Sequence, residues 1–196
     1  MLYKVALFIH ILGAISLFVG VSIVLVSMLG MRRAKTVEAF REWSALVSSS
    51  GKIMPGAALL LIISGIYMLL TVWHWQTAWA DVALASVLLI FVLGPTFIGP
   101  RLMALHNAAS IAPDGRVPRP LRLQTLDPIL WTMVYVLTTI ALGILLLMIG
   151  KPTLVGAIIT IGIAIILGPA CALPIWQAKQ AFKDVTQQQT EKIEQP

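Results

Sequence analysis

The sequence contains few charged residues, and this scarcity excludes most soluble folds. Only 11% of its 196 residues are Asp, Glu, Lys or Arg, whereas a soluble domain has about 25%. Its one cysteine, Cys171, excludes an internal disulfide and a Cys-x-x-Cys metal or redox site. The chain also has no P-loop, Gly-x-Ser-x-Gly or His-Glu-x-x-His motif, so no motif identifies a catalytic reaction.

Long apolar segments are what the sequence has in abundance. Five segments could each cross a hydrocarbon core of about 30 Å as a helix, since a helix rises about 1.5 Å per residue. These predicted spans are residues 3–31, 54–75, 82–105, 128–149 and 153–176. The sequence therefore predicts an all-α fold, a polytopic membrane bundle of five transmembrane helices. One domain covers residues 1–178, and a polar cytoplasmic tail, 179–196, follows it.

Between the first two spans, apolar and aromatic side chains recur at helical spacing. Phe40, Trp43 and Val47 alternate there with basic residues. This pattern predicts a separate amphipathic helix that lies on the membrane surface.

The distribution of basic residues predicts the orientation of the chain. With the N-terminus outside, twelve of the fourteen lysines and arginines fall on the cytoplasmic side, and only Lys4 and Lys151 lie outside. Positive residues gather on the cytoplasmic side of membrane proteins, so the prediction is N-out and C-in. The expected location is the bacterial cytoplasmic (inner) membrane, as a multi-pass protein. We expect the lipid bilayer as partner, anionic lipid at the cytoplasmic face and no nucleic acid, and a homo-oligomer stays open.

One ionisable residue, His10, lies inside the first span. Small residues recur there at every seventh position, as Ala6, Gly13, Gly20 and Ser27. Such a face lets a neighbouring helix approach closely, and His10 projects from the same face. It therefore points into the bundle rather than at lipid. Ionisable residues are rare inside a membrane and usually mark a functional site, so we expect His10 to have a functional role.

Two further residues are expected near His10 at the outer boundary. His74 ends the second span, and Asp81 is the only acidic residue on the outer side. As an axial ligand of haem b, His10 would have His74 as its second ligand, and Gly13 would leave clearance for the macrocycle. As a copper ligand, it would join His74 and a methionine, because imidazole and thioether suit copper, and Asp81 is a further candidate metal ligand. A buried histidine without a cofactor, hydrogen-bonded to a partner helix, is the third interpretation.

A polar stripe follows one face of the second span. Ser64, Tyr67 and Thr71 lie three and four residues apart and therefore share a helix face. The stripe indicates either the wall of a polar cavity or hydrogen bonds between helices.

A repeated proline motif predicts an alternative function. Leu-Gly-Pro, followed five residues later by a second proline, occurs at 93–100 in the third span and at 167–174 in the fifth. Kinked helices of this kind can line a cavity. The second hypothesis is therefore a small-molecule or ion transporter with a cavity between the third and fifth helices. The third is a ligand-free scaffold that uses its basic connections to hold anionic lipid or a cytoplasmic partner.

The first span also resembles a known family. The run Y-K-V-A-L-F-I-H-I-L-G-A-I-S-L-F-V-G, residues 3–20, is similar to the first helix of the copper resistance protein D superfamily and of HemJ-type protoporphyrinogen oxidases. In both, a histidine follows an aromatic and apolar lead-in and precedes a glycine-bearing half-helix. Over its whole length the chain resembles a family of predicted bacterial integral membrane proteins, a domain of unknown function related to those two groups. The resemblance implies a haem or copper role for His10, with b-type haem in electron transfer or haem handling as the first hypothesis.

Overall fold

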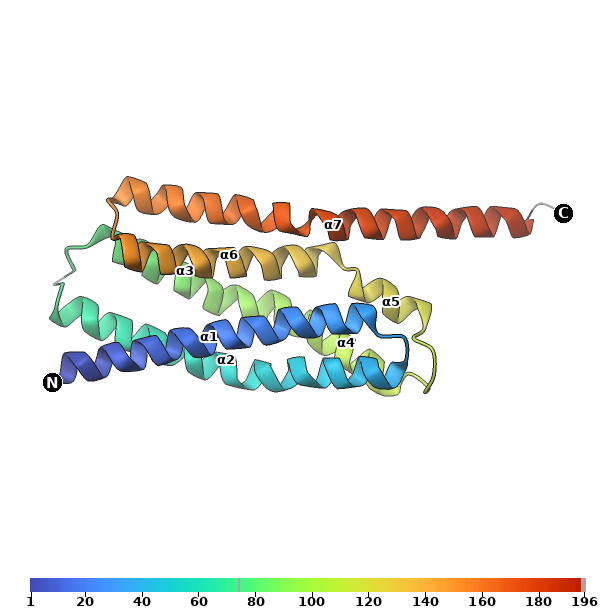
Figure 1. Cartoon of the computed structure of the whole chain (residues 1–196), viewed down its shortest axis with the longest axis horizontal. Helices are drawn as coiled ribbons and strands as arrows, with labels where there is room; N and C mark the ends of the chain where they lie inside the picture. The colour runs from blue at the N-terminus through green and yellow to red at the C-terminus, as the bar shows by residue number, and fades with distance from the viewer. Residues whose placement is uncertain (74, 195–196) are drawn as a thin grey trace.

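The chain folds into an elongated bundle of long helices (Figure 1). The computed structural model describes residues 1–73 and 75–194, and the side chains of residues 182–194 lie outside that description. The helices are α1 (Leu2–Arg33), α2 (Val37–Thr71), α3 (Ala78–Leu93), the π-helical segment η1 (Gly94–Ile98), α4 (Gly99–Ile111), α5 (Arg119–Thr125), α6 (Pro128–Gly150) and α7 (Leu154–Glu194).

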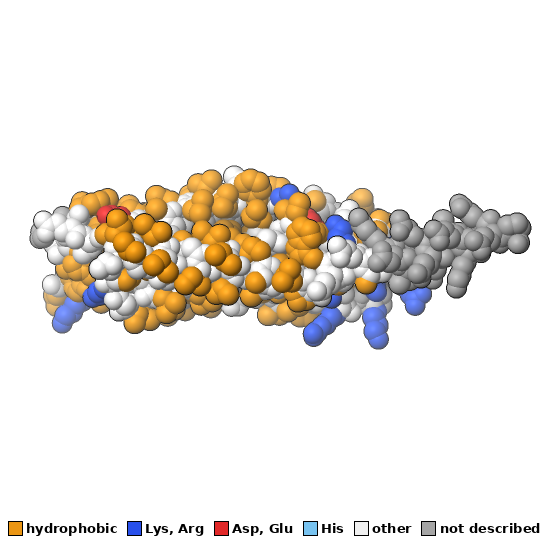
Figure 2. Space-filling model, turned by 90° about the horizontal axis from the view of Figure 1, so that it is seen from above, with side chains coloured by type: hydrophobic (Ala, Val, Ile, Leu, Met, Phe, Trp, Pro, Cys, Tyr) orange, Lys and Arg blue, Asp and Glu red, His pale blue; other side chains and the backbone are white. Residues whose placement is uncertain are grey.

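Among the described residues, five helical segments are long and apolar enough to cross a membrane, which confirms the predicted fold class. They are Leu2–Arg33, Val37–Thr71, Ala78–Ile111, Arg119–Gly150 and Leu154–Ala181. Their outer faces are apolar, and in the space-filling view hydrophobic side chains cover the long middle of the molecule while Lys and Arg lie toward its ends (Figure 2). An apolar outer surface of this kind suits contact with lipid chains.

Two helical hairpins, joined by α3, η1 and α4, make up the bundle. Helix α1 packs along α2, α6 packs along α7, and the connecting helices contact both α2 and α6. The small residues of α1 permit the first contact, because a Cβ added to Gly13 would lie 3.1 Å from the backbone nitrogen of Leu61. In the second hairpin, a Cβ added to Gly168 would lie 2.5 Å from Cα of Val136. Both hairpins therefore depend on close approach of helix backbones.

The predicted surface helix between the first two spans is wrong. Residues 37–71 form one continuous helix of 35 residues, which begins at the N-cap residue Thr36 and contains Pro55. Phe40 and Val47 are buried against other helices rather than facing lipid. The helical period was correct, but the apolar face packs on protein. A helix of this length extends about 52 Å, more than the hydrocarbon core of about 30 Å, so part of α2 projects beyond the membrane.

Arg41 connects the projecting first half of α2 to the segment that follows α4. Its guanidinium donates hydrogen bonds to the backbone carbonyls of Ala109 and Ala112, and it pairs with the Asp114 carboxylate at 2.6 Å. These contacts hold the connection that follows α4 against the first half of α2. At the same end of the bundle, Trp131 is fully buried, and its Nε1 donates to the carbonyl of Thr125 at 2.9 Å.

The two proline motifs fold differently. In the third span, Gly94–Ile98 forms a π-helical turn, and the Thr96 hydroxyl donates to the carbonyl of Val92 at 2.7 Å. Helix α7 continues as an α-helix through Pro169 and Pro174. A π turn widens a helix locally, so only the third span is interrupted at its motif.

Candidate functional site

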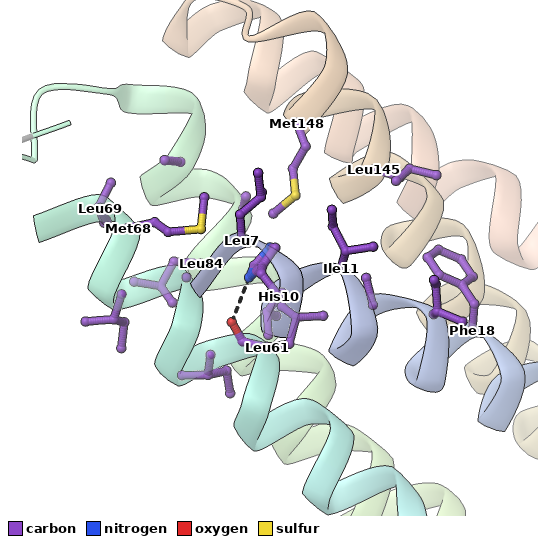
Figure 3. A pocket seen from close by; sticks show the side chains of 18 of the residues that line it. Leu7, His10, Ile11, Phe18, Leu61, Met68, Leu69, Leu84, Leu145 and Met148 are labelled. Carbon is purple, nitrogen blue, oxygen red and sulfur yellow. Dashed lines mark hydrogen bonds between the residues drawn. The ribbon is translucent and has the colours of Figure 1, made fainter. Parts of the chain in front are cut away.

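A cavity of about 920 Å³ lies between α1, α2, α3 and α6 and extends along α1 from Tyr3 to Val26 (Figure 3). Most of the residues around it are apolar, and two of its few polar side chains are His10 on α1 and Lys151 in the turn between α6 and α7. The cavity exists because α1 packs on α2 whereas α6 packs on α3 and α7. Helix α1 and the end of α6 are thus left with a space between them.

Helix α2 holds His10 through one ring nitrogen. Nδ1 lies 3.1 Å from the Leu61 carbonyl oxygen and 3.1 Å from the Ser64 hydroxyl, and the side chain is 7% exposed (Figure 3). A carbonyl oxygen only accepts, and the Ser64 hydroxyl donates to the carbonyl of Leu60 at 2.5 Å. Nδ1 therefore carries a proton, and in the neutral form of the ring the lone pair is on Nε2.

The second ring nitrogen is uncommitted. Within the described part of the chain, Nε2 of His10 makes no hydrogen bond, while His10 itself lines the cavity. A histidine whose Nδ1–H is held by a backbone carbonyl is the usual arrangement of a metal-ligating imidazole, because that bond fixes the tautomer and the ring orientation.

Gly65 is a site residue that the sequence reasoning missed. A Cβ added there would lie 3.2 Å from Cε1 of His10 and 3.5 Å from its Nδ1. The missing side chain makes room for the imidazole against α2. The sequence does place Gly65 directly after Ser64, a residue of the polar stripe. Only the register between α1 and α2 shows that Gly65 contacts His10.

Gly13 lies at the helix contact rather than along the cavity. Its added Cβ would meet Leu61 and the Ala57 carbonyl at 3.1–3.3 Å, so its small size brings α2 close to α1. That approach places the Leu61 carbonyl within reach of His10. In this structure, α2 therefore occupies the space left by the missing side chain of Gly13.

The other predicted ligands are not brought to His10 in the described part of the chain. His74 lies outside the described residues. Asp81 is exposed in the first turn of α3 and does not line the cavity. Among the described residues there is no group of three or more His, Cys, Asp or Glu side chains that could hold a metal ion.

The polar stripe of α2 divides into one buried residue and two exposed ones. Ser64 is buried and contacts His10, which fits hydrogen bonding between helices. Tyr67 is 36% exposed, and the exposed Thr71 donates to the Tyr67 carbonyl at 2.8 Å. Neither this cavity nor a second one of about 550 Å³ is lined by any of the three, and no described side chain of α7 lines either cavity.

Across the cavity from His10 are groups that the sequence did not single out. Met148 reaches into the cavity from α6, toward His10, and Met68 lines it from α2 (Figure 3). Nζ of Lys151 lies 5.4 Å from the ring centroid of Trp73, which in turn contacts Trp79 edge to face at 4.8 Å. The cavity therefore has an imidazole in its wall, two thioethers and a cation at its rim.

Comparison with curated proteins finds no match, and none is found among solved structures. A family model described as "Predicted integral membrane protein (DUF2269)" matches residues 4–152. The matched segment includes His10, Ser64, Gly65 and Lys151. Since it covers more than half of the sequence, the chain belongs to the DUF2269 family of predicted integral membrane proteins.

Proposed function

We propose that the protein binds haem b in the cavity beside His10 and serves electron transfer or haem handling in the membrane. One observation carries the proposal. The Leu61 carbonyl fixes the proton of His10 on Nδ1, and this leaves Nε2 free at an apolar cavity. A neutral imidazole in a helical bundle is a common axial ligand of haem iron.

The surroundings fit the group. The volume of about 920 Å³ falls within the range of about 300–1,000 Å³ usual for cofactor and ligand sites, and the wall is largely apolar. His10 would hold the iron, and Lys151 would pair with a propionate at the rim. Met148 is a second residue that could hold the iron, because thioether sulfur also ligates haem iron, and His74 stays the other candidate. When bound, haem would supply a one-electron redox centre.

The test is an absorption spectrum with matched histidine variants. The full-length protein is purified from haem-replete cells, and its Soret band is recorded for the wild type, His10→Ala and His106→Ala. We expect the band in the wild type and in His106→Ala, because His106 lies outside this cavity. His10→Ala should lose it. A wild-type spectrum without haem, or one that His10→Ala leaves unchanged, removes the proposal.

We also propose the N-out and C-in orientation, in a bacterial inner membrane. The charge distribution supports it, since basic side chains concentrate at the end where α1 meets α2 and α4 meets α5. The haem site would then open near the outer leaflet, and the basic end would face anionic lipid. In a Cys171→Ala background, a membrane-impermeant maleimide added to intact cells should label Lys4→Cys and spare Arg116→Cys. The reverse pattern contradicts the orientation.

A further inference from the structure

The second cavity, of about 550 Å³, lies between α1, α2, α6 and the interrupted helix α3–η1–α4. None of the described acidic side chains lines it, and most of its wall is apolar. The exceptions are Ser48, Lys52, His106 and Thr138. The Thr138 hydroxyl donates to the carbonyl of Val134 at 2.7 Å, so Ser48 and Lys52 are the donors available to a ligand.

Missing side chains open this cavity. A Cβ added to Gly51 or Gly94 would meet nothing within 4 Å. Gly94 begins the π turn, which widens the helix at the cavity wall. The exposed Pro55 and Met103 border the same space, so the cavity is a groove that opens to the outer surface of the bundle.

The polar groups follow one edge of the groove. Ser48 and Lys52 lie one helical turn apart on α2, and Ser44 lies one turn before them. The Ser44 hydroxyl donates to the carbonyl of Arg41 at 2.9 Å, and its oxygen lies 3.0 Å from Nδ1 of His106. This contact holds the imidazole at the end of the same polar edge.

The polar edge lies at the level where hydrocarbon gives way to headgroups. Lys52 is the last charged residue of α2, and Ile53–Thr71 contains none. On the neighbouring helices, Arg101 and Asp127 form an ion pair at 3.5 Å at the start of the apolar helix α6. Lys52 makes no ion pair with the described residues. Its charge is therefore available at the mouth of a groove that runs toward the membrane interior.

We propose that this groove binds an anionic phospholipid, with an acyl chain along its apolar wall and the phosphate at Lys52 and Ser48. The apolar groove matches the chain, and the unpaired cation matches the negative headgroup. A zwitterionic lipid would bring its own cation to the same place and gain less. This site is separate from the His10 cavity and does not depend on haem.

Native mass spectrometry of the delipidated full-length protein tests the site. Phosphatidylglycerol and phosphatidylcholine are titrated separately into the wild type and two pairs of variants. Lys52→Gln removes the proposed headgroup contact, and Arg116→Gln removes an exposed charge on the same end of the molecule. Gly51→Leu fills the groove, whereas Gly56→Leu adds the same side chain to open space on the same helix, outside the groove.

We expect the wild type to prefer phosphatidylglycerol. Lys52→Gln should weaken that binding about fivefold, the effect of one basic residue at a membrane surface, and Arg116→Gln less than twofold. Gly51→Leu should abolish retention of the lipid, and Gly56→Leu should keep it. Equal binding of the two lipids, or equal effects within either pair, overturns the proposal. If Gly51→Leu fails to fold, the comparison of Lys52→Gln with Arg116→Gln decides alone.

Discussion

The two ends of the bundle are packed in different ways. At the basic end, Phe40 and Trp131 are fully buried and Arg41 fastens the connection after α4. At the other end, α1 and α6 are separated by the cavity beside His10. The difference indicates that the two regions have separate roles. Close packing around Phe40 and Trp131 supplies stability, and incomplete packing beside His10 supplies space for a ligand.

The largest effect is expected from Trp131→Ala at the basic end. This change removes a fully buried side chain and its hydrogen bond to Thr125, so the free energy of unfolding should fall by about 3–5 kcal/mol. Thermal unfolding in detergent measures it, with the half-buried Trp73→Ala as the matched variant at the other end. An equal decrease in the free energy of unfolding for Trp131→Ala and Trp73→Ala would contradict these separate roles.

Arg41→Ala should have a smaller effect at the same end. The variant leaves the carbonyls of Ala109 and Ala112 without their donor, at a cost of about 1–3 kcal/mol. Hydrogen exchange should rise in the segment 109–117 and stay unchanged around His10. Arg41→Lys is the control, because one ammonium cannot replace the guanidinium contacts with both carbonyls and Asp114. Full protection in both variants means that Arg41 does not fasten this connection.

At the His10 end, Ser64→Ala should weaken ligand binding without unfolding the protein. It removes one of the two contacts of Nδ1 and leaves the Leu61 carbonyl. Loss of such an orienting contact typically costs about tenfold or more in metal affinity. Haem titration followed at the Soret band measures it, and Thr71→Ala on the same helix face is the control. Unchanged affinity in Ser64→Ala shows that the serine does not position the ring.

The smallest effect is expected from Lys151→Gln at the rim. Losing one exposed cation should reduce haem affinity about fivefold if the lysine pairs with a propionate. Haem dimethyl ester, whose propionates are blocked, should bind the wild type and Lys151→Gln equally. A similar loss for both compounds assigns Lys151 to the shape of the rim rather than to charge pairing.

Much of this architecture could be predicted from the sequence. Hydropathy sets the number of spans, and the seven-residue repeat of small residues identifies the face of α1 that meets α2. The first half of α2 was mispredicted because an amphipathic pattern does not say whether its apolar face meets lipid or protein. Phe40 packs against residues of α4 and of the connection that follows it. These residues are far from Phe40 in the sequence, so the pattern around Phe40 does not reveal the contact.

The site could be predicted only in part. An imidazole inside an apolar span already indicated His10, and the polar stripe already included Ser64. The Leu61 carbonyl carries no sequence signal, because every residue has one. Gly65 and Met148 belong to the site through the registers of α2 and α6 against α1, which depend on packing throughout the bundle.

The state of His10 in the ligand-free protein can be measured by ¹⁵N NMR of histidine-labelled samples, with the signal assigned by its loss in His10→Ala. The structure predicts a neutral ring protonated on Nδ1, with an unprotonated Nε2. A neutral ring protonated on Nε2 would contradict it, because the Leu61 carbonyl could not then accept a hydrogen bond from Nδ1.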